Sequence, residues 1–166
     1  MAIRNIRIMG DDILTKVSRE VTTVDRKTRV LIGDMLDTMY EDNGVGLAAV
    51  QVGILKRIVV IDVSEEGNEP IILINPVIVA TEGEQTGDEG CLSLPGKVAT
   101  VTRPNYAKVK ACNEKMEEIT VEGTGLLARA ICHELDHLDG VLYPSRMTGE
   151  LRNVRSAEEA DESEDK

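Results

Sequence analysis

The chain has only two histidines, His133 and His137, and they stand four residues apart in the run HELDH. Residues at this spacing are neighbours on one face of an α-helix, so both imidazoles can bind the same metal ion. Glu134, beside the first histidine, is then placed to take a proton from metal-bound water. The pattern therefore predicts a hydrolytic metal centre on a helix, rather than a solvated helix that carries two histidines.

Two histidines leave this site incomplete, because catalytic zinc-type centres use three protein ligands. The extended protease motif would place a third histidine where Tyr143 stands. A downstream glutamate would have to come from an acidic C-terminal stretch without apolar neighbours (Glu158, Glu159 or Glu162). Cys91 lies in the compact segment EGCLSLP, which can present a thiolate. The spacing favours Cys91 over these alternatives.

The other two cysteines are expected to pack. One step along a helix turns a side chain by about 100°, so Cys132 should point away from the metal-binding face. Cys112 lies in a predicted strand. Three cysteines without a dense framework fit a reducing compartment. The N-terminus lacks signal- or transit-peptide character and no apolar run could span a membrane, so we expect a cytoplasmic protein.

Length and charge limit the organisation and the partners. The 166 residues predict one catalytic domain over 1–150, followed at 151–166 by an acidic, disordered tail. The net charge of −11 argues against DNA and against an anionic membrane as partners.

Apolar periodicity predicts two helices, over 25–43 and 124–138, which end before Gly44 and Gly140. Val30, Leu31 and Met35, together with Met39, should form the core face of the first. Strands are predicted over 57–63, 71–74, 77–81, 98–101, 107–112 and 116–121, with turns at Asn75-Pro76 and Asn113-Glu114. The expected fold class is α+β, with mostly antiparallel β-sheets wrapped around the second helix.

Three segments resemble the signature motifs of peptide deformylases: GVGLAAVQ at 44–51, EGCLS at 89–93 and HELDHL at 133–138. Their order and separation also match, and the resemblance extends over roughly residues 3–147. The absence of a long insertion between the first two motifs is similar to the shorter bacterial form of the family. The resemblance implies a peptide deformylase-like catalytic domain. Many family members have Gln where Cys132 stands, a departure expected to affect packing.

The resemblance implies a metal held by Cys91, His133 and His137, natively Fe(II), for which Zn, Ni or Co can substitute. It implies hydrolysis of the formyl group from the N-terminal formyl-methionine of newly synthesised polypeptides. The expected mechanism is attack by metal-bound hydroxide, with Glu134 as general base and then acid. The Gln51 amide and the Leu92 N–H would stabilise the oxyanion.

The substrate is expected to bind as an extended strand beside Val45, Gly46 and Gly90. Leu126 and Ala130, with Val45, are the candidates for an apolar pocket that holds the methionine side chain. Core packing is the alternative for the apolar residues, and turn geometry for the glycines.

The expected partners are N-formylmethionyl nascent chains. Transient proximity to the ribosome is possible, but the acidic C-terminus would repel ribosomal RNA and supplies no basic docking helix. Two alternatives to a deformylase stay open at this stage. One is a conventional metallopeptidase, and the other is a non-catalytic protein that binds formylated chains or senses metal or redox state.

Overall fold

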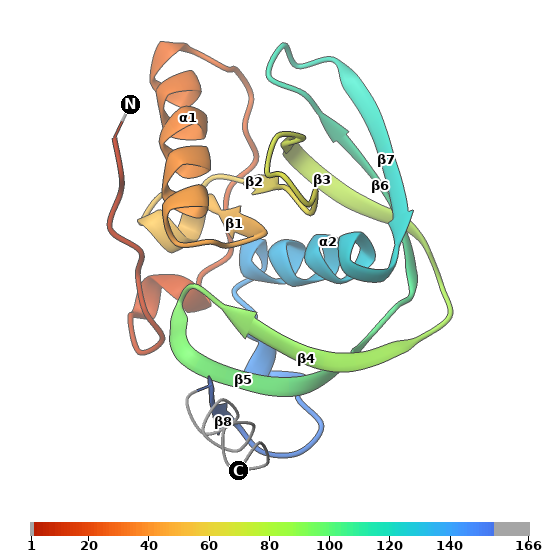
Figure 1. Ribbon diagram of the computed structural model, residues 1–166. Coiled ribbons are helices and arrows are strands. Elements are labelled where there is room, and N and C mark those ends of the chain that lie inside the picture. Colours follow the sequence, from red (N-terminus) through yellow and green to blue (C-terminus); the bar gives the residue numbers. More distant parts are fainter. Residues whose placement is uncertain (1, 155–166) are drawn as a thin grey trace.

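Helix α2 (Gly125–Leu138) runs through the middle of the computed structural model, which describes residues 2–154, and lies between two β-sheets (Figure 1). The five-stranded sheet has the order β1-β2-β3-β6-β7, and the three-stranded sheet the order β4-β5-β8. All named strand pairs are antiparallel, which confirms the predicted α+β class. The strands are β1 (Gly46–Ala48), β2 (Ile58–Ile61), β3 (Ile71–Glu82), β4 (Gln85–Cys91), β5 (Leu94–Arg103), β6 (Tyr106–Cys112), β7 (Glu118–Thr124) and β8 (Arg152–Asn153).

Helix α2 is amphipathic, and its two faces have different tasks. Ile131, Leu135 and Leu138 are buried in a core cluster with apolar residues of the five-stranded sheet. His133, Glu134 and His137 lie on the same helix and are also buried. The helix ends before Gly140, whose φ of 76° is left-handed and whose Cβ, if present, would lie 2.4 Å from the Thr15 carbonyl oxygen. Glycine is therefore required where α2 packs against the N-terminal segment.

Helix α1 (Arg26–Glu41) confirms the first predicted helix. Asp25 caps it, because its carboxylate accepts a hydrogen bond from the Thr28 N–H at 2.8 Å. Leu31, Met35 and Met39 are buried as expected, but Val30 is 48% exposed. The prediction for Val30 was wrong because the buried stripe follows the 3.6-residue period, and Val30 lies to one side of it.

The predicted turn at Asn75-Pro76 was wrong: β3 continues through both residues, with a register shift between Ile74 and Val77. Asn75 has a φ of 52°, which bends the strand without ending it. Its side chain accepts a hydrogen bond from the Val21 N–H and donates one to the Val21 carbonyl, both at 2.8 Å. The Asn75 side chain at the bend thus satisfies the backbone of Val21 and ties the N-terminal segment to β3.

The remaining strand predictions missed three strands, β1, β4 and β8. The segments 57–63, 98–101, 107–112 and 116–121 overlap β2, β5, β6 and β7, and the turn at Asn113 joins β6 to β7. Strand β4 was missed, because its sequence QTGDEGC has no apolar alternation. It forms a hairpin with β5, closed by a turn at Leu92 and Ser93.

Part of the segment predicted as a tail is ordered. Strand β8 pairs with β5, with Asn153 opposite Lys97 and Arg152 opposite Val98. The rest of the predicted acidic tail, 155–166, lies outside the described residues. Within 2–154, no helix is long and apolar enough to cross a membrane.

Candidate metal centre and active site

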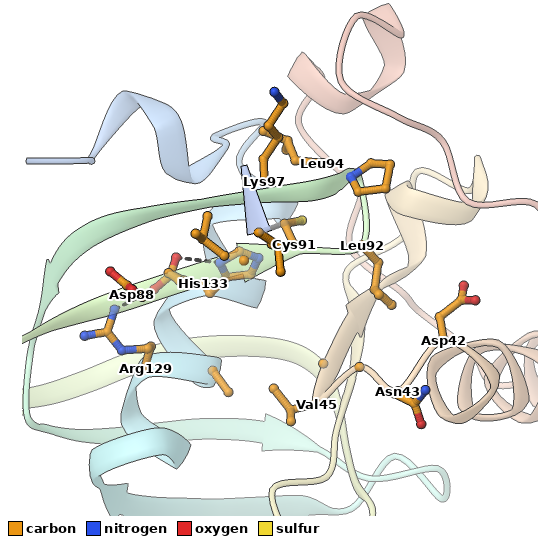
Figure 2. A pocket seen from close by; sticks show the side chains of 18 of the residues that line it. Asp42, Asn43, Val45, Asp88, Cys91, Leu92, Leu94, Lys97, Arg129 and His133 are labelled. Atoms are coloured by element: carbon orange, nitrogen blue, oxygen red, sulfur yellow. Dashed lines mark hydrogen bonds and ion pairs between the residues drawn. The ribbon is translucent and has the colours of Figure 1, made fainter. Parts of the chain in front are cut away.

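Three side chains converge where α2 faces the end of β4. The Nε2 atoms of His133 and His137 are 3.2 Å apart, and Cys91 Sγ is 3.3 Å from His137 Nε2. All three donor atoms lie within 4.8 Å of one another, and both histidines are buried. Figure 2 shows Cys91 beside the His133 ring at the wall of a cavity. Two adjacent helical turns and one strand end therefore present one sulfur and two nitrogens to the same point.

This donor set fits a single metal ion. Donors bound tetrahedrally at about 2.1 Å are roughly 3.4 Å apart, close to the two distances between His137 Nε2 and its neighbours. Thiolate and imidazole suit Zn and Fe(II) better than Mg or Ca. The Nδ1 atom of His133 is occupied by a hydrogen bond, so its Nε2 is the nitrogen left for a metal.

Glu89 determines the orientation of the His133 ring. Its Oε2 lies 2.7 Å from His133 Nδ1, and it also accepts hydrogen bonds from Arg103 (2.7 and 3.1 Å) and Arg129 (3.0 Å). Burial alone would raise the pKa of Glu89, but the hydrogen bonds from His133 and Arg103 outweigh it and lower the pKa to about 2. Glu89 is thus an ionised acceptor that holds the His133 Nδ1–H in place.

Glu134 lies on α2 beside these donors and is 3% exposed. Its Oε1 is 3.8 Å from His133 Nε2, and its Oε2 is buried without a hydrogen-bond partner among the described residues. Burial raises the pKa of Glu134 to about 7. A buried carboxyl group of this kind can accept and return a proton near neutral pH.

Gln51 is buried on the other side of Cys91, in the 3-10 helix η2 (Ala49–Val52). Its Oε1 accepts the Ala48 N–H at 2.9 Å, which fixes the amide orientation. Its Nε2 donates to Ser93 Oγ at 3.0 Å and lies 3.5 Å from Cys91 Sγ. Leu92, whose N–H was predicted to bind the oxyanion, lies in the adjacent turn and lines the cavity.

Cys91 and His133, together with Glu134, line a cavity of about 600 Å³. All five residues predicted to bind substrate line it: Val45, Gly46, Gly90, Leu126 and Ala130. Val45 and Leu126 are 41% and 51% exposed, so core packing does not account for them. Figure 2 shows Val45 and Leu92 among the side chains that line this cavity. The cavity is large enough for a side chain together with an extended backbone.

A sequence model of the polypeptide deformylase family matches residues 3–153. A peptide deformylase of Lachnoclostridium phytofermentans is 66% identical over 98% of this chain and 99% of its own length. This chain belongs to the polypeptide deformylase family. It is a hydrolase that removes the N-terminal formyl group from newly synthesised polypeptides, and the family depends on a metal.

Solved deformylases have the same fold. The Legionella pneumophila peptide deformylase is 42% identical, with a TM-score of 0.85 over 88% of this chain and 86% of that one. The Synechococcus elongatus deformylase, solved in complex with actinonin, is 40% identical, with a TM-score of 0.84 over 89% and 80% of the two chains. This likeness confirms the expected deformylase fold.

Sequence reasoning missed three residues of this deformylase that contact the site, Glu89, Arg103 and Arg129. Glu89 stood in the EGCLS motif, but no local pattern connects it to a histidine 44 residues away. Cys132 is buried in the core cluster around α2, as its packing prediction required.

Proposed function

We propose that this chain deformylates N-terminal formyl-methionine with one ion, natively Fe(II), held by Cys91, His133 and His137. Zn, Ni or Co would substitute, because the same three donors suit each of these ions. When bound, such an ion polarises the formyl carbonyl and lowers the pKa of a water molecule. The convergence of one sulfur and two nitrogens within 4.8 Å is the observation that supports this most directly.

Glu134 carries the proton in this proposal. Its carboxylate takes a proton from the attacking water as the water oxygen bonds to the formyl carbon. It then gives that proton to the departing nitrogen as the C–N bond breaks, which leaves formate and a free N-terminal amine. The raised pKa of Glu134, about 7, supports both transfers near neutral pH.

The oxyanion that develops on the formyl oxygen needs hydrogen-bond donors already in position. We assign this role to the side-chain amide of Gln51 and the backbone N–H of Leu92. The hydrogen bond from the Ala48 N–H to Gln51 Oε1 supports the assignment, since it orients Gln51 Nε2 toward Cys91 Sγ.

Substrate binding follows from the cavity wall. An extended peptide would pair with the backbone at Val45, Gly46 and Gly90, where two glycines allow a close approach. The methionine side chain would lie against Leu126, Ala130 and Val45. The small Ala130 leaves room for a long thioether.

The proposed substrates are nascent chains, so we place the reaction in the bacterial cytoplasm with transient proximity to the ribosome. The acidic sequence at 156–166 argues against docking on ribosomal RNA. The deformylase would then meet its substrates by diffusion.

Formate release from formyl-Met-Ala-Ser tests these roles, with protein loaded anaerobically with Fe(II). The parent should release formate, Glu134→Ala should bind metal but not turn over, and Cys91→Ser should lose the metal. Metal retention by Cys91→Ser, with activity, would refute the ligand assignment. Cleavage of internal peptide bonds without formate release would instead support a conventional metallopeptidase.

A further inference from the structure

Asp136 stands between the two histidines of the HELDH run, but its carboxylate binds arginines. Arg103 Nη1 donates to Asp136 Oδ2 at 2.7 Å. Arg146, beyond the 3-10 helix η3 (Tyr143–Ser145), donates to the same carboxylate at 2.6 and 3.1 Å. Both carboxylate oxygens of Asp136 are therefore occupied by charged donors.

Arg103 links Asp136 to the candidate metal ligand. Its Nε and Nη2 donate to the two oxygens of Glu89, and Glu89 Oε2 contacts His133 Nδ1. Figure 2 marks the interactions of His133 and Arg129 with dashed lines. One rigid guanidinium thus bridges two carboxylates, of which only Glu89 reaches the histidine.

Because Arg103 is buried between the carboxylates of Asp136 and Glu89, loss of either carboxylate should disturb its hydrogen bonds to the other. The Arg103 and Glu89 side chains are 4% and 5% exposed, and Asp136 is 17% exposed. A buried guanidinium left with an unpaired N–H is costly, so Arg103 would rotate to find another acceptor. Because the fork is planar, that rotation would disturb both of its bonds to Glu89.

We propose that Asp136 is a positioning residue for His133, acting through Arg103 and Glu89, and that Arg146 holds Asp136 in place. The inference rests on the proposed ligand set. The proposal connects the segment after α2 to the metal centre through ion pairs. Loss of a residue that orients a metal-binding histidine typically weakens metal binding by about 10- to 100-fold.

The test compares Asp136→Asn with Asp139→Asn. Asp139 is three residues further on, carries the same charge and pairs with Arg57 at 3.1 Å, away from this bridge. Both variants are loaded with Co(II), whose visible absorption reports the geometry of its ligands, and are then titrated with a competing chelator. Asp136→Asn should lose Co(II) at a chelator concentration about tenfold lower, with an altered spectrum. Asp139→Asn should match the parent.

Arg146→Gln is the milder second variant, since Arg146 is half-exposed and outside the core. It should shift the spectrum in the same direction, by less. Deformylation should show a lower kcat with KM unchanged in Asp136→Asn, and circular dichroism checks that each variant is folded. Identical chelator titrations for Asp136→Asn and Asp139→Asn would overturn the proposal. If Asp136→Asn does not fold, an unchanged spectrum in Arg146→Gln would overturn it. Formate release by the parent leaves the proposed function standing in either case.

Discussion

Gly46→Ala should disable the enzyme by moving Glu134. A Cβ at Gly46 would lie 2.7 Å from Glu134 Oε1, 2.8 Å from its Cγ and 2.9 Å from its Cδ. Ordinary contacts begin at 3.4 Å, so the carboxylate must retreat by 3.4 − 2.7 = 0.7 Å. Rotation of the terminal group cannot relieve this clash, because Cγ is also too close. A misplacement of about 1 Å costs on the order of 10²-fold in rate, so we expect kcat to fall by nearly that factor.

The assay is formate release at saturating and at limiting peptide, which separates kcat from KM. Metal content should stay close to that of the parent, because the metal donors are not displaced. Gly33→Ala is the matched control: its Cβ meets nothing within 4 Å, so kcat should not change. A Gly46→Ala enzyme with kcat within about threefold of the parent would refute this account of Glu134.

Three further changes test other parts of the structure. Asp34 accepts hydrogen bonds from the Ala2 N–H and from Arg4; burial would raise its pKa, but these bonds lower it below 3.8. The stabilisation by ionised Asp34 is therefore present above pH 3.8 and is lost as the pH falls through the lower pKa of the folded state. Asp34→Asn should make the free energy of unfolding, measured with urea, depend less on pH in this acidic range. Asn75→Ala should cost about 2–3 kcal/mol in urea unfolding, more than Asn75→Gly, since glycine accepts the positive φ; equal losses would contradict this. Val154 lines the cavity near β5, so Val154→Asp should raise KM for long formylated peptides more than for formyl-Met-Ala-Ser, and equal effects would exclude this contact.

The helix with the two histidines could be predicted from the sequence because the pattern that predicts it lies within the helix itself. Spacing of four residues places His133 and His137 together on any α-helix, and the apolar stripe of α2 requires only the 3.6-residue period. Cys91 could be favoured by spacing but not chosen, because its approach depends on how β4 crosses α2. The motif resemblance supplied that long-range information.

Other features depend on contacts that no local pattern encodes. Asn75-Pro76 reads as a turn, yet Val21 satisfies the Asn75 side chain and keeps β3 continuous. Strand β4 is polar because it carries site residues. It therefore lacks the alternation of apolar and polar residues by which a strand is predicted from sequence. The contact of Asp136 could not be predicted locally, since its partner Arg103 comes from a strand 33 residues earlier.

X-ray absorption spectroscopy of the Zn-loaded protein tests the central claim, that Cys91, His133 and His137 bind one metal. The account predicts one sulfur at about 2.3 Å and two imidazole nitrogens at about 2.0–2.1 Å, with the sulfur absent in Cys91→Ser. A parent spectrum without sulfur, or a sulfur that persists in Cys91→Ser, would contradict it.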